Sequence, residues 1–315
     1  MLSANAERLD ERDQFYDCAC FFWSNIYIAS LNRHFKFINK QQFYHDYRHI
    51  VDSNTDFDEV LNQMGILDPV FIDICRRSLE MIAVNFLSYM ELYGVGGSEF
   101  RLYQFPVFTE SFCVKLIEEI DNFNKNPYIP KERPNTMNKY GVLLDEMGML
   151  PLIDEVRKSY LNHLSKCLFP DVFDDTLDSH RAFTVAYTRD TEAELGFHYD
   201  NAEVTLNVAL DDCNSFKGGQ VYFCGMRNDP IESTSCCAVD HKLGYGILHR
   251  GQQLHGALPI EQGRRSNLII WMRSSKTRAI LCPMCNDKSR ELIACPAGDY
   301  GDGFKKYQEN VCNLI

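Results

Sequence analysis

The sequence predicts an α+β fold in which a jelly-roll core of antiparallel strands, with helices packed on it, follows an α-helical N-terminal module. Two observations support this fold. Short runs rich in β-branched and aromatic residues recur between Gly, Asp and Asn turns, at 181–188, 203–210, 219–224, 245–250, 254–260 and 266–273. The first hundred residues instead repeat apolar side chains at helical spacing.

The N-terminal module is predicted to span residues 1–100. Its helical segments lie near 41–51, 56–64 and 70–93, and the apolar stripe of the last one consists of Phe71, Ile74, Cys75, Leu79, Ile82 and Phe86. Glycines 94 to 97 end this segment. We interpret the module as a helical cap or a partner-binding element.

The jelly-roll module is predicted to span residues 101–280, and it begins with a helix. Thr109 is a typical N-cap, and Phe112, Leu116, Ile120 and Phe123 form one apolar stripe, which would pack on the outside of the sheet. A Pro- and Asn-rich loop, 124–141, follows. Such a loop either selects a substrate, through the candidates Arg133, Asn135, Thr136 and Asn138, or is a structural connector.

A candidate metal site lies in the triplet His198-Tyr199-Asp200 together with His255 far downstream. In an extended strand, side chains two residues apart point to the same face, so His198 and Asp200 can bind one ion. Two imidazoles and one carboxylate are the ligands of non-haem ferrous oxygenases. Taken alone, the triplet also fits a surface loop.

His249 competes with His255 for the place of third ligand, because only six residues separate them. We assign His255, since it opens the segment that leads through Gly263 to Arg265. His249 is then interpreted as a histidine packed beside the ligands.

Arg265 enters the apolar run 266–273, which is predicted to be a buried strand. A buried guanidinium needs an anion, and its planar fork suits a carboxylate. The partner is either a dicarboxylate co-substrate or one of the protein's own acids.

Several motifs between Thr184 and Arg273 carry a family resemblance: TVAYTRD, ELGFHYDNAEVTLNVALDD, FKGGQVYF, LHRGQQLHGALP and GRRSNLIIWMR. With them the chain resembles the prolyl and lysyl hydroxylase branch of the 2-oxoglutarate and iron-dependent oxygenases. RPNTMNKYGVLL at 133–144, LDSHRAF at 177–183 and LCPMC at 281–285 narrow the resemblance within this superfamily, and it covers most of the chain from about residue 100 onward.

The resemblance implies a double-stranded β-helix, the jelly roll of this family, and a dioxygenase reaction. His198, Asp200 and His255 would bind Fe(II), and Arg265 would bind the distal carboxylate of 2-oxoglutarate. Dioxygen would be consumed, succinate and carbon dioxide released, a protein side chain hydroxylated, and L-ascorbate would keep the iron ferrous. The alternatives are a catalytically silent jelly-roll binding protein and an interaction protein stabilised by zinc.

The resemblance also implies that Tyr187 and Asn207 bind the co-substrate. For Asn207 the residues themselves agree, because in 204–210 it shares a small polar face with Thr205 while the other face is apolar, as in a barrel wall around a ligand. Tyr187 has the apolar neighbours Phe183 and Val185 on its face, so core packing is an equal alternative.

The cysteines are odd in number, 13, which predicts reduced thiols rather than a disulfide framework. The adjacent pair Cys236–Cys237 is interpreted as ordinary strand packing. In the tail, 281–315, four cysteines could hold a structural zinc, although their later spacings are irregular: Cys282, Cys285, Cys295 and Cys312.

Charge and hydropathy exclude several partners. The net charge of −12 argues against nucleic-acid binding. No apolar window is long enough for a membrane span, and the first fifteen residues lack the apolar region of a secretory signal. We therefore expect an intracellular protein, cytoplasmic or nuclear, that acts on a protein or a small molecule.

Overall fold

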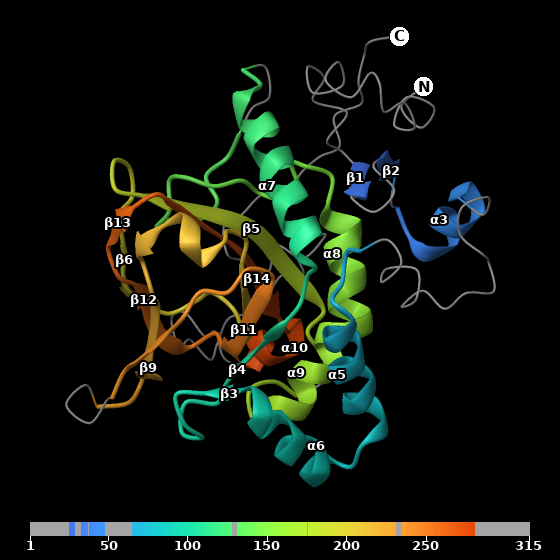
Figure 1. Cartoon of the computed structure of the whole chain (residues 1–315). Helices are drawn as coiled ribbons and strands as arrows, with labels where there is room; N and C mark the ends of the chain where they lie inside the picture. Colours follow the sequence, from blue (N-terminus) through green and yellow to red (C-terminus); the bar gives the residue numbers. More distant parts are fainter. Residues whose placement is uncertain are drawn as a thin grey trace.

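The computed structural model describes residues 25–28, 33–36, 38–47, 65–127, 131–174, 176–230 and 235–280. Its larger antiparallel sheet has six strands in the order β3-β4-β11-β7-β14-β5. They are β3 (Gly94–Val95), β4 (Leu102–Pro106), β5 (Ser179–Thr188), β7 (Val204–Ala209), β11 (Tyr245–Arg250) and β14 (Arg264–Arg273). β5 and β14 pair along their whole length and cross the centre of the molecule in Figure 1.

The smaller antiparallel sheet has four strands in the order β10-β9-β12-β6. They are β6 (Leu195–His198), β9 (Val221–Met226), β10 (Cys237–Val239) and β12 (Gln253–Ala257). Two strand pairs stand apart from both sheets: β1 (Asn25–Ile28) with β2 (Arg33–Lys36), and β8 (Lys217–Gly218) with β13 (Ile260–Gln262). The six predicted strand positions therefore correspond, to within a few residues, to β5, β7, β9, β11, β12 and β14. The other strands were not among the predicted positions: β1, β2, β3, β4, β6, β8, β10 and β13.

The helices lie against the face of the larger sheet that is turned away from the smaller sheet (Figure 1). The α-helices are α3 (Lys40–Tyr47), α5 (Pro69–Glu80), α6 (Ala83–Met90), α7 (Glu110–Lys125), α8 (Leu150–Val156), α9 (Asn162–Leu168) and α10 (Ser275–Ile280). The π-helical turn η5 (Arg157–Leu161) joins α8 to α9, and η4 (Glu91–Tyr93) and η6 (Cys213–Ser215) are short 3-10 turns. Among the described residues, no helix has the length and apolar character needed to cross a bilayer.

Helix α7 begins where the sequence predicted, because the Thr109 side chain caps it by accepting a hydrogen bond from the Phe112 N–H at 3.2 Å. Its four predicted stripe residues are all buried in the core between helices and sheet. An apolar layer between helices and a sheet needs one apolar face on each element. Strand β7 supplies such a face, because Val204, Leu206 and Val208 point to the helices. Thr205 and Asn207 point to the opposite face, as alternation requires.

The two sheets face each other across a second apolar cluster. In it Phe223 and Val221 of β9 meet Leu102 of β4 and Ile247 of β11. The polar residues on the facing sides of the two sheets therefore point into the same space between the sheets. This arrangement brings together residues that are far apart in the sequence.

The predicted helical segment 70–93 is helical, but it forms α5 and α6 with a break at Met81 and Ile82, followed by η4, rather than one helix. The predicted stripe fails at Leu79, near the end of α5, and at Ile82, in the break, because these two side chains are 60% and 69% exposed. Phe71 and Phe86 are buried in the same cluster as residues of the larger sheet. The core thus includes residues on both sides of the predicted boundary at residue 100, and the division into two modules there stays a prediction. The predicted segment 56–64 lies outside the described residues.

The prediction of reduced thiols is wrong at Cys224 and Cys236, which form a disulfide. Twelve residues separate them, yet they lie opposite each other because β9 and β10 pair with Cys237 across from Phe223. Cys236 is therefore bonded across the hairpin and is not ordinary strand packing. Cys237, the other member of the adjacent pair, is a free thiol. The four tail cysteines predicted to hold zinc lie outside the described residues.

Candidate metal centre

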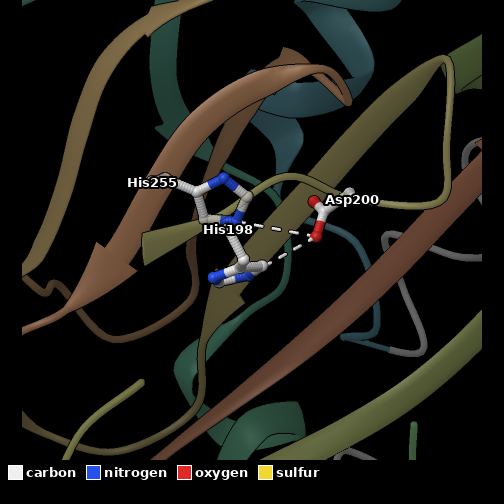
Figure 2. A group of neighbouring side chains, drawn as sticks. All are labelled: His198, Asp200 and His255. Carbon is white, nitrogen blue, oxygen red and sulfur yellow. Dashed lines mark ion pairs between the residues drawn. The ribbon is translucent and has the colours of Figure 1, made fainter. Parts of the chain in front are cut away.

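The smaller sheet brings His198, Asp200 and His255 together. His198 ends β6 and lies directly opposite His255 in the pairing of β6 with β12. Asp200 follows β6, and its Oδ1 atom lies 3.7 Å from His198 Nε2 and 3.6 Å from His255 Nε2. One ligand atom from each residue lies within 4.8 Å of the others, and the three side chains converge on one point in Figure 2. Two metal–ligand bonds of about 2.1 Å can span such separations.

The tautomers of the two histidines are fixed by the main chain. His198 Nδ1 lies 2.8 Å from the carbonyl oxygen of Gly196, and His255 Nδ1 lies 2.8 Å from that of Gln253. A carbonyl oxygen only accepts, so each Nδ1 carries the proton and each Nε2 presents a lone pair to the centre. Burial and the nearby His255 lower the pKa of His198 to about 4, which keeps its imidazole neutral and able to bind a metal.

Asp200 is held rigidly, with only one carboxylate oxygen left for a ligand. The Thr205 hydroxyl donates to Oδ2 at 2.7 Å, the Asp200 N–H donates to the Gly251 carbonyl at 2.8 Å, and the Gln252 amide donates to the Asp200 carbonyl at 3.0 Å. Burial alone would raise the pKa of Asp200, but the surrounding imidazoles and the Thr205 hydroxyl lower it. The group is therefore a carboxylate whose Oδ1 faces both histidines.

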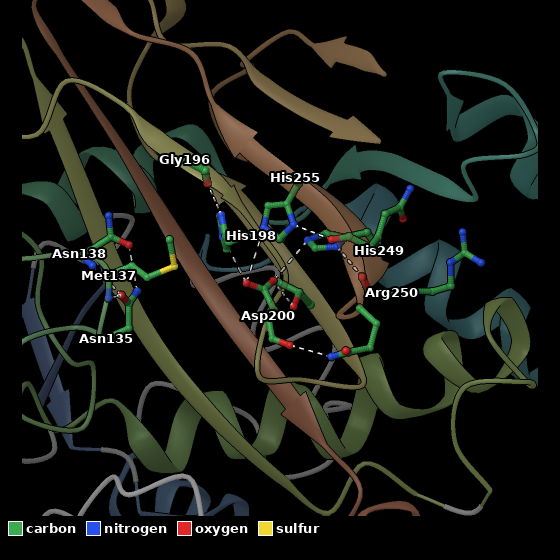
Figure 3. Close-up of polar contacts among 12 residues, drawn as sticks. Asn135, Met137, Asn138, Gly196, His198, Asp200, His249, Arg250 and His255 are labelled. Carbon is green, nitrogen blue, oxygen red and sulfur yellow. Dashed lines mark hydrogen bonds and ion pairs between the residues drawn. The ribbon is translucent and has the colours of Figure 1, made fainter. Parts of the chain in front are cut away.

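His249 lies on the Oδ2 side of Asp200 and is not among the three converging side chains, and its interpretation as a histidine packed beside the ligands stays a prediction. It is completely buried, its ring centre is 4.9 Å from that of His255, and its Nε2 lies 3.8 Å from Asp200 Oδ2. Its Nδ1 faces the carbonyl oxygen of Arg250 at 3.0 Å. Figure 3 shows His249 on the far side of Asp200 from His198.

Arg265 of β14 lies on the inner face of the larger sheet and is 2% exposed. Its guanidinium donates to the carbonyl oxygen of Gly219 and lies 4.6 Å from the ring centre of Tyr187. Among the described residues no carboxylate forms an ion pair with it, and its Nε has no partner there. Burial lowers the pKa of Arg265, so binding of an external anion would relieve that desolvation.

Tyr187 and Asn207 lie on the same inner wall. Tyr187, for which core packing was an equal alternative, is 2% exposed and packs with Val185 as well as with Arg265. Asn207 Oδ1 accepts a hydrogen bond from Asn267 Nδ2 at 2.7 Å. We did not predict Asn267, although its position two residues after Arg265 in a strand places it on the same face.

The loop that follows α7 reaches this wall with two of its four candidate residues. Asn135 and Asn138 are buried, whereas Arg133 and Thr136 are exposed. Figure 3 shows Asn135, Met137 and Asn138 grouped to one side of the histidine and aspartate cluster. The hydrogen bonds of this loop were beyond the reach of the sequence because they depend on β5 and on the turn after it.

Comparisons with known proteins show what the chain is similar to. Residues 55–174 match the family model described as OGFOD2-like domain. The chain is 37% identical to human 2-oxoglutarate and iron-dependent oxygenase domain-containing protein 2, with 95% of this chain and 97% of the relative aligned. A mimivirus protein named procollagen lysyl hydroxylase and glycosyltransferase is 29% identical over 53% of this chain and 19% of its own length. A prolyl 4-hydroxylase structure from Phytophthora capsici superposes with a TM-score of 0.43, at 15% identity, over 65% of this chain and 66% of that one.

Proposed function

Because the chain belongs to the family of 2-oxoglutarate and iron-dependent oxygenase domain-containing protein 2, we propose that it hydroxylates a protein side chain at an iron held by His198, Asp200 and His255. The protein is a 2-oxoglutarate- and iron-dependent oxygenase by this membership. The observation that carries the assignment of the ligands is the convergence of two imidazoles and one carboxylate, each already oriented by the backbone or by Thr205.

The donor set suits ferrous iron. Nitrogen and carboxylate ligands on one side of the ion leave the other side for a chelating co-substrate and dioxygen. The hydrogen bonds from each Nδ1 to a carbonyl oxygen increase the basicity of the opposite Nε2. Iron and 2-oxoglutarate, once bound, supply oxidising chemistry that consumes dioxygen and releases succinate and carbon dioxide.

Arg265 is the residue that we propose to bind the distal carboxylate of 2-oxoglutarate. It lies buried without an acidic partner among the described residues, and a free carboxylate would supply the missing counter-charge. Tyr187 would add a hydroxyl donor, and Asn207 an amide on the same wall. The chain's own residues thus bind and orient the co-substrate and keep water away from it.

The fold that we propose for the two facing sheets is the double-stranded β-helix, or jelly roll. Its support is the strand order, in which sequence neighbours such as β11 and β12 lie in opposite sheets. With this alternation, the proposed histidine ligands would lie on one sheet and the proposed co-substrate wall on the other.

A protein side chain is the proposed substrate because the matched mimivirus relative is named as a procollagen lysyl hydroxylase. We propose L-ascorbate as the reductant that keeps the iron ferrous between turnovers. Succinate formation from 2-oxoglutarate with added Fe(II) tests the reaction, with Asp200→Ala as the inactive control. Turnover in the wild type but not in the variant supports the proposal. Tight binding of both iron and 2-oxoglutarate without any succinate would instead indicate a binding protein.

A further inference from the structure

Two buried amides, Asn135 and Asn138, lie in the loop between α7 and α8, with 6% and 2% of their surfaces exposed. The backbone N–H groups of Met137 and Asn138 both donate to Asn135 Oδ1, at 2.8 and 2.7 Å. An N–H group cannot accept a hydrogen bond, so the amide oxygen and not the amide nitrogen must face the backbone. The main chain therefore fixes which way round the Asn135 side chain lies.

The orientation of the Asn135 amide in turn determines the orientation of the Asn138 amide. Asn135 Nδ2 donates to Asn138 Oδ1 at 3.0 Å, which turns the Asn138 amide nitrogen towards β5. There Asn138 Nδ2 donates to the Tyr187 hydroxyl oxygen at 3.0 Å and faces Glu192 Oε2 at 3.4 Å. Glu192 also accepts the backbone N–H of Lys139 at 2.8 Å, which ties the loop to the turn after β5.

The consequence for Tyr187 is that its oxygen accepts while its proton stays available. Burial raises the pKa of Tyr187 to about 12, so the phenol keeps this proton at neutral pH. Among the described residues no acceptor for it is present. The Arg265 guanidinium lies over the same ring, so the Tyr187 hydroxyl donor and the Arg265 cation lie side by side on the buried inner face of the larger sheet.

We propose that Asn138, held in orientation by Asn135, is a positioning residue that directs the Tyr187 hydroxyl proton to the carboxylate bound by Arg265. The inference rests on the proposed function, which places the distal carboxylate of 2-oxoglutarate there. An Asn138 amide turned the other way would accept the phenol proton and remove one donor from the site. The two asparagines thus determine the polarity of a hydrogen-bond chain that starts at the backbone and ends at the co-substrate.

The test is the affinity of the Mn(II)-loaded protein for 2-oxoglutarate, measured by calorimetry without oxygen. Asn138→Ala is expected to weaken binding about tenfold to a hundredfold, the range for one hydrogen bond to a charged group. Tyr187→Phe should weaken it similarly, and the double variant no further, because Asn138 acts only through the hydroxyl. Oxalate, which chelates the metal but has no distal carboxylate, should bind all variants equally.

Two further variants separate positioning from loop support. Thr136→Ala removes an exposed side chain from the same loop and should leave 2-oxoglutarate affinity at the wild-type value. Asn138→Asp keeps the size and still accepts from Asn135, but towards Tyr187 it can only accept, so 2-oxoglutarate binding should fall while oxalate binding does not.

The outcomes that overturn the inference differ from those that overturn the function. Additive losses in Asn138→Ala and Tyr187→Phe, or equal losses for oxalate, would mean that Asn138 only supports the loop. Wild-type affinity in both Asn138 variants would also refute positioning and leave the proposed function standing. If the wild-type protein loaded with Mn(II) binds oxalate but not 2-oxoglutarate, the proposed co-substrate site fails, and this inference fails with it.

Discussion

Replacing His255 or His249 by alanine should separate a metal ligand from a residue that packs behind one. Both are histidines on the inner side of the fold, and both point Nε2 at Asp200. They approach different oxygens, however. His255 faces Oδ1, which His198 also faces, whereas His249 faces Oδ2, which already accepts from Thr205.

The expected losses differ by an order of magnitude. Four-ligand zinc sites contribute about 10–16 kcal/mol, or about 3 kcal/mol per ligand, so His255→Ala should weaken metal binding by about a hundredfold or more. Residues that only orient a ligand typically contribute about tenfold to a hundredfold. For His249→Ala we expect about tenfold, because the Thr205 hydroxyl still holds Asp200 at 2.7 Å.

Stability should show a separate effect. His249 is completely buried between Phe223 and His255, with ring centres 4.9 Å away in both cases. Its truncation leaves a cavity, which should lower the free energy of unfolding of the metal-free protein by about 2–4 kcal/mol. His249→Ala is thus expected to be the destabilised variant that keeps the metal.

Titration calorimetry with Mn(II) and urea unfolding in the presence of a chelator measure the two quantities. A larger loss of metal affinity in His249→Ala than in His255→Ala would reverse the assignment of the third ligand. Equal losses would show that Asp200 needs both imidazoles alike, and the division of its two oxygens would then be wrong.

Two predictions concern stability away from the metal. Burial raises the pKa of Glu146 from 4.5 to about 7. The stability that its protonated form contributes to the folded protein is therefore fully present below pH 4.5 and is lost as pH rises through about 7. Measured by urea unfolding, the free energy of unfolding of Glu146→Gln relative to the wild type should therefore rise by about 2 kcal/mol from pH 5 to pH 8, after discounting for partial exposure. An equal difference between the two proteins at both pH values would contradict this prediction. Cys236→Ser removes the disulfide to Cys224 and should lower the free energy of unfolding by about 2–3 kcal/mol without reductant. Cys213→Ser, which changes an exposed free thiol, should not change it measurably. An intact mass that shows both thiols free would refute the bond.

The sequence was most informative where a rule acts over one or two residues. The spacing of His198 and Asp200 needs only an extended backbone, and the cap at Thr109 needs only the next helical turn. The alternation of apolar and polar residues along β7 likewise predicted which side chains share the apolar face that packs against the helices. Each of these rules is local, so no knowledge of the rest of the fold is required.

Features that depend on distant partners were missed or left open. The Cys224–Cys236 bond depends on the register of β9 and β10, and a shift of one residue would place the two thiols on opposite faces. Tyr187 could not be separated from a core tyrosine, because its polar partner Asn138 lies 49 residues earlier in the chain. Apolar neighbours in the strand predict burial, but not the contact made by one hydroxyl group.

The division of the site between two sheets explains why the inter-sheet packing matters for the reaction. The histidine ligands belong to the smaller sheet, whereas Arg265 and Tyr187 belong to the larger one. Phe223 joins them, because it packs on His255 at 5.5 Å and also belongs to the apolar cluster between the sheets. A bound co-substrate would have to touch the metal with one end and Arg265 with the other. Close packing resists compression, so we propose that this cluster holds His255 and Arg265 at a fixed separation, which the co-substrate of the proposed site would have to match.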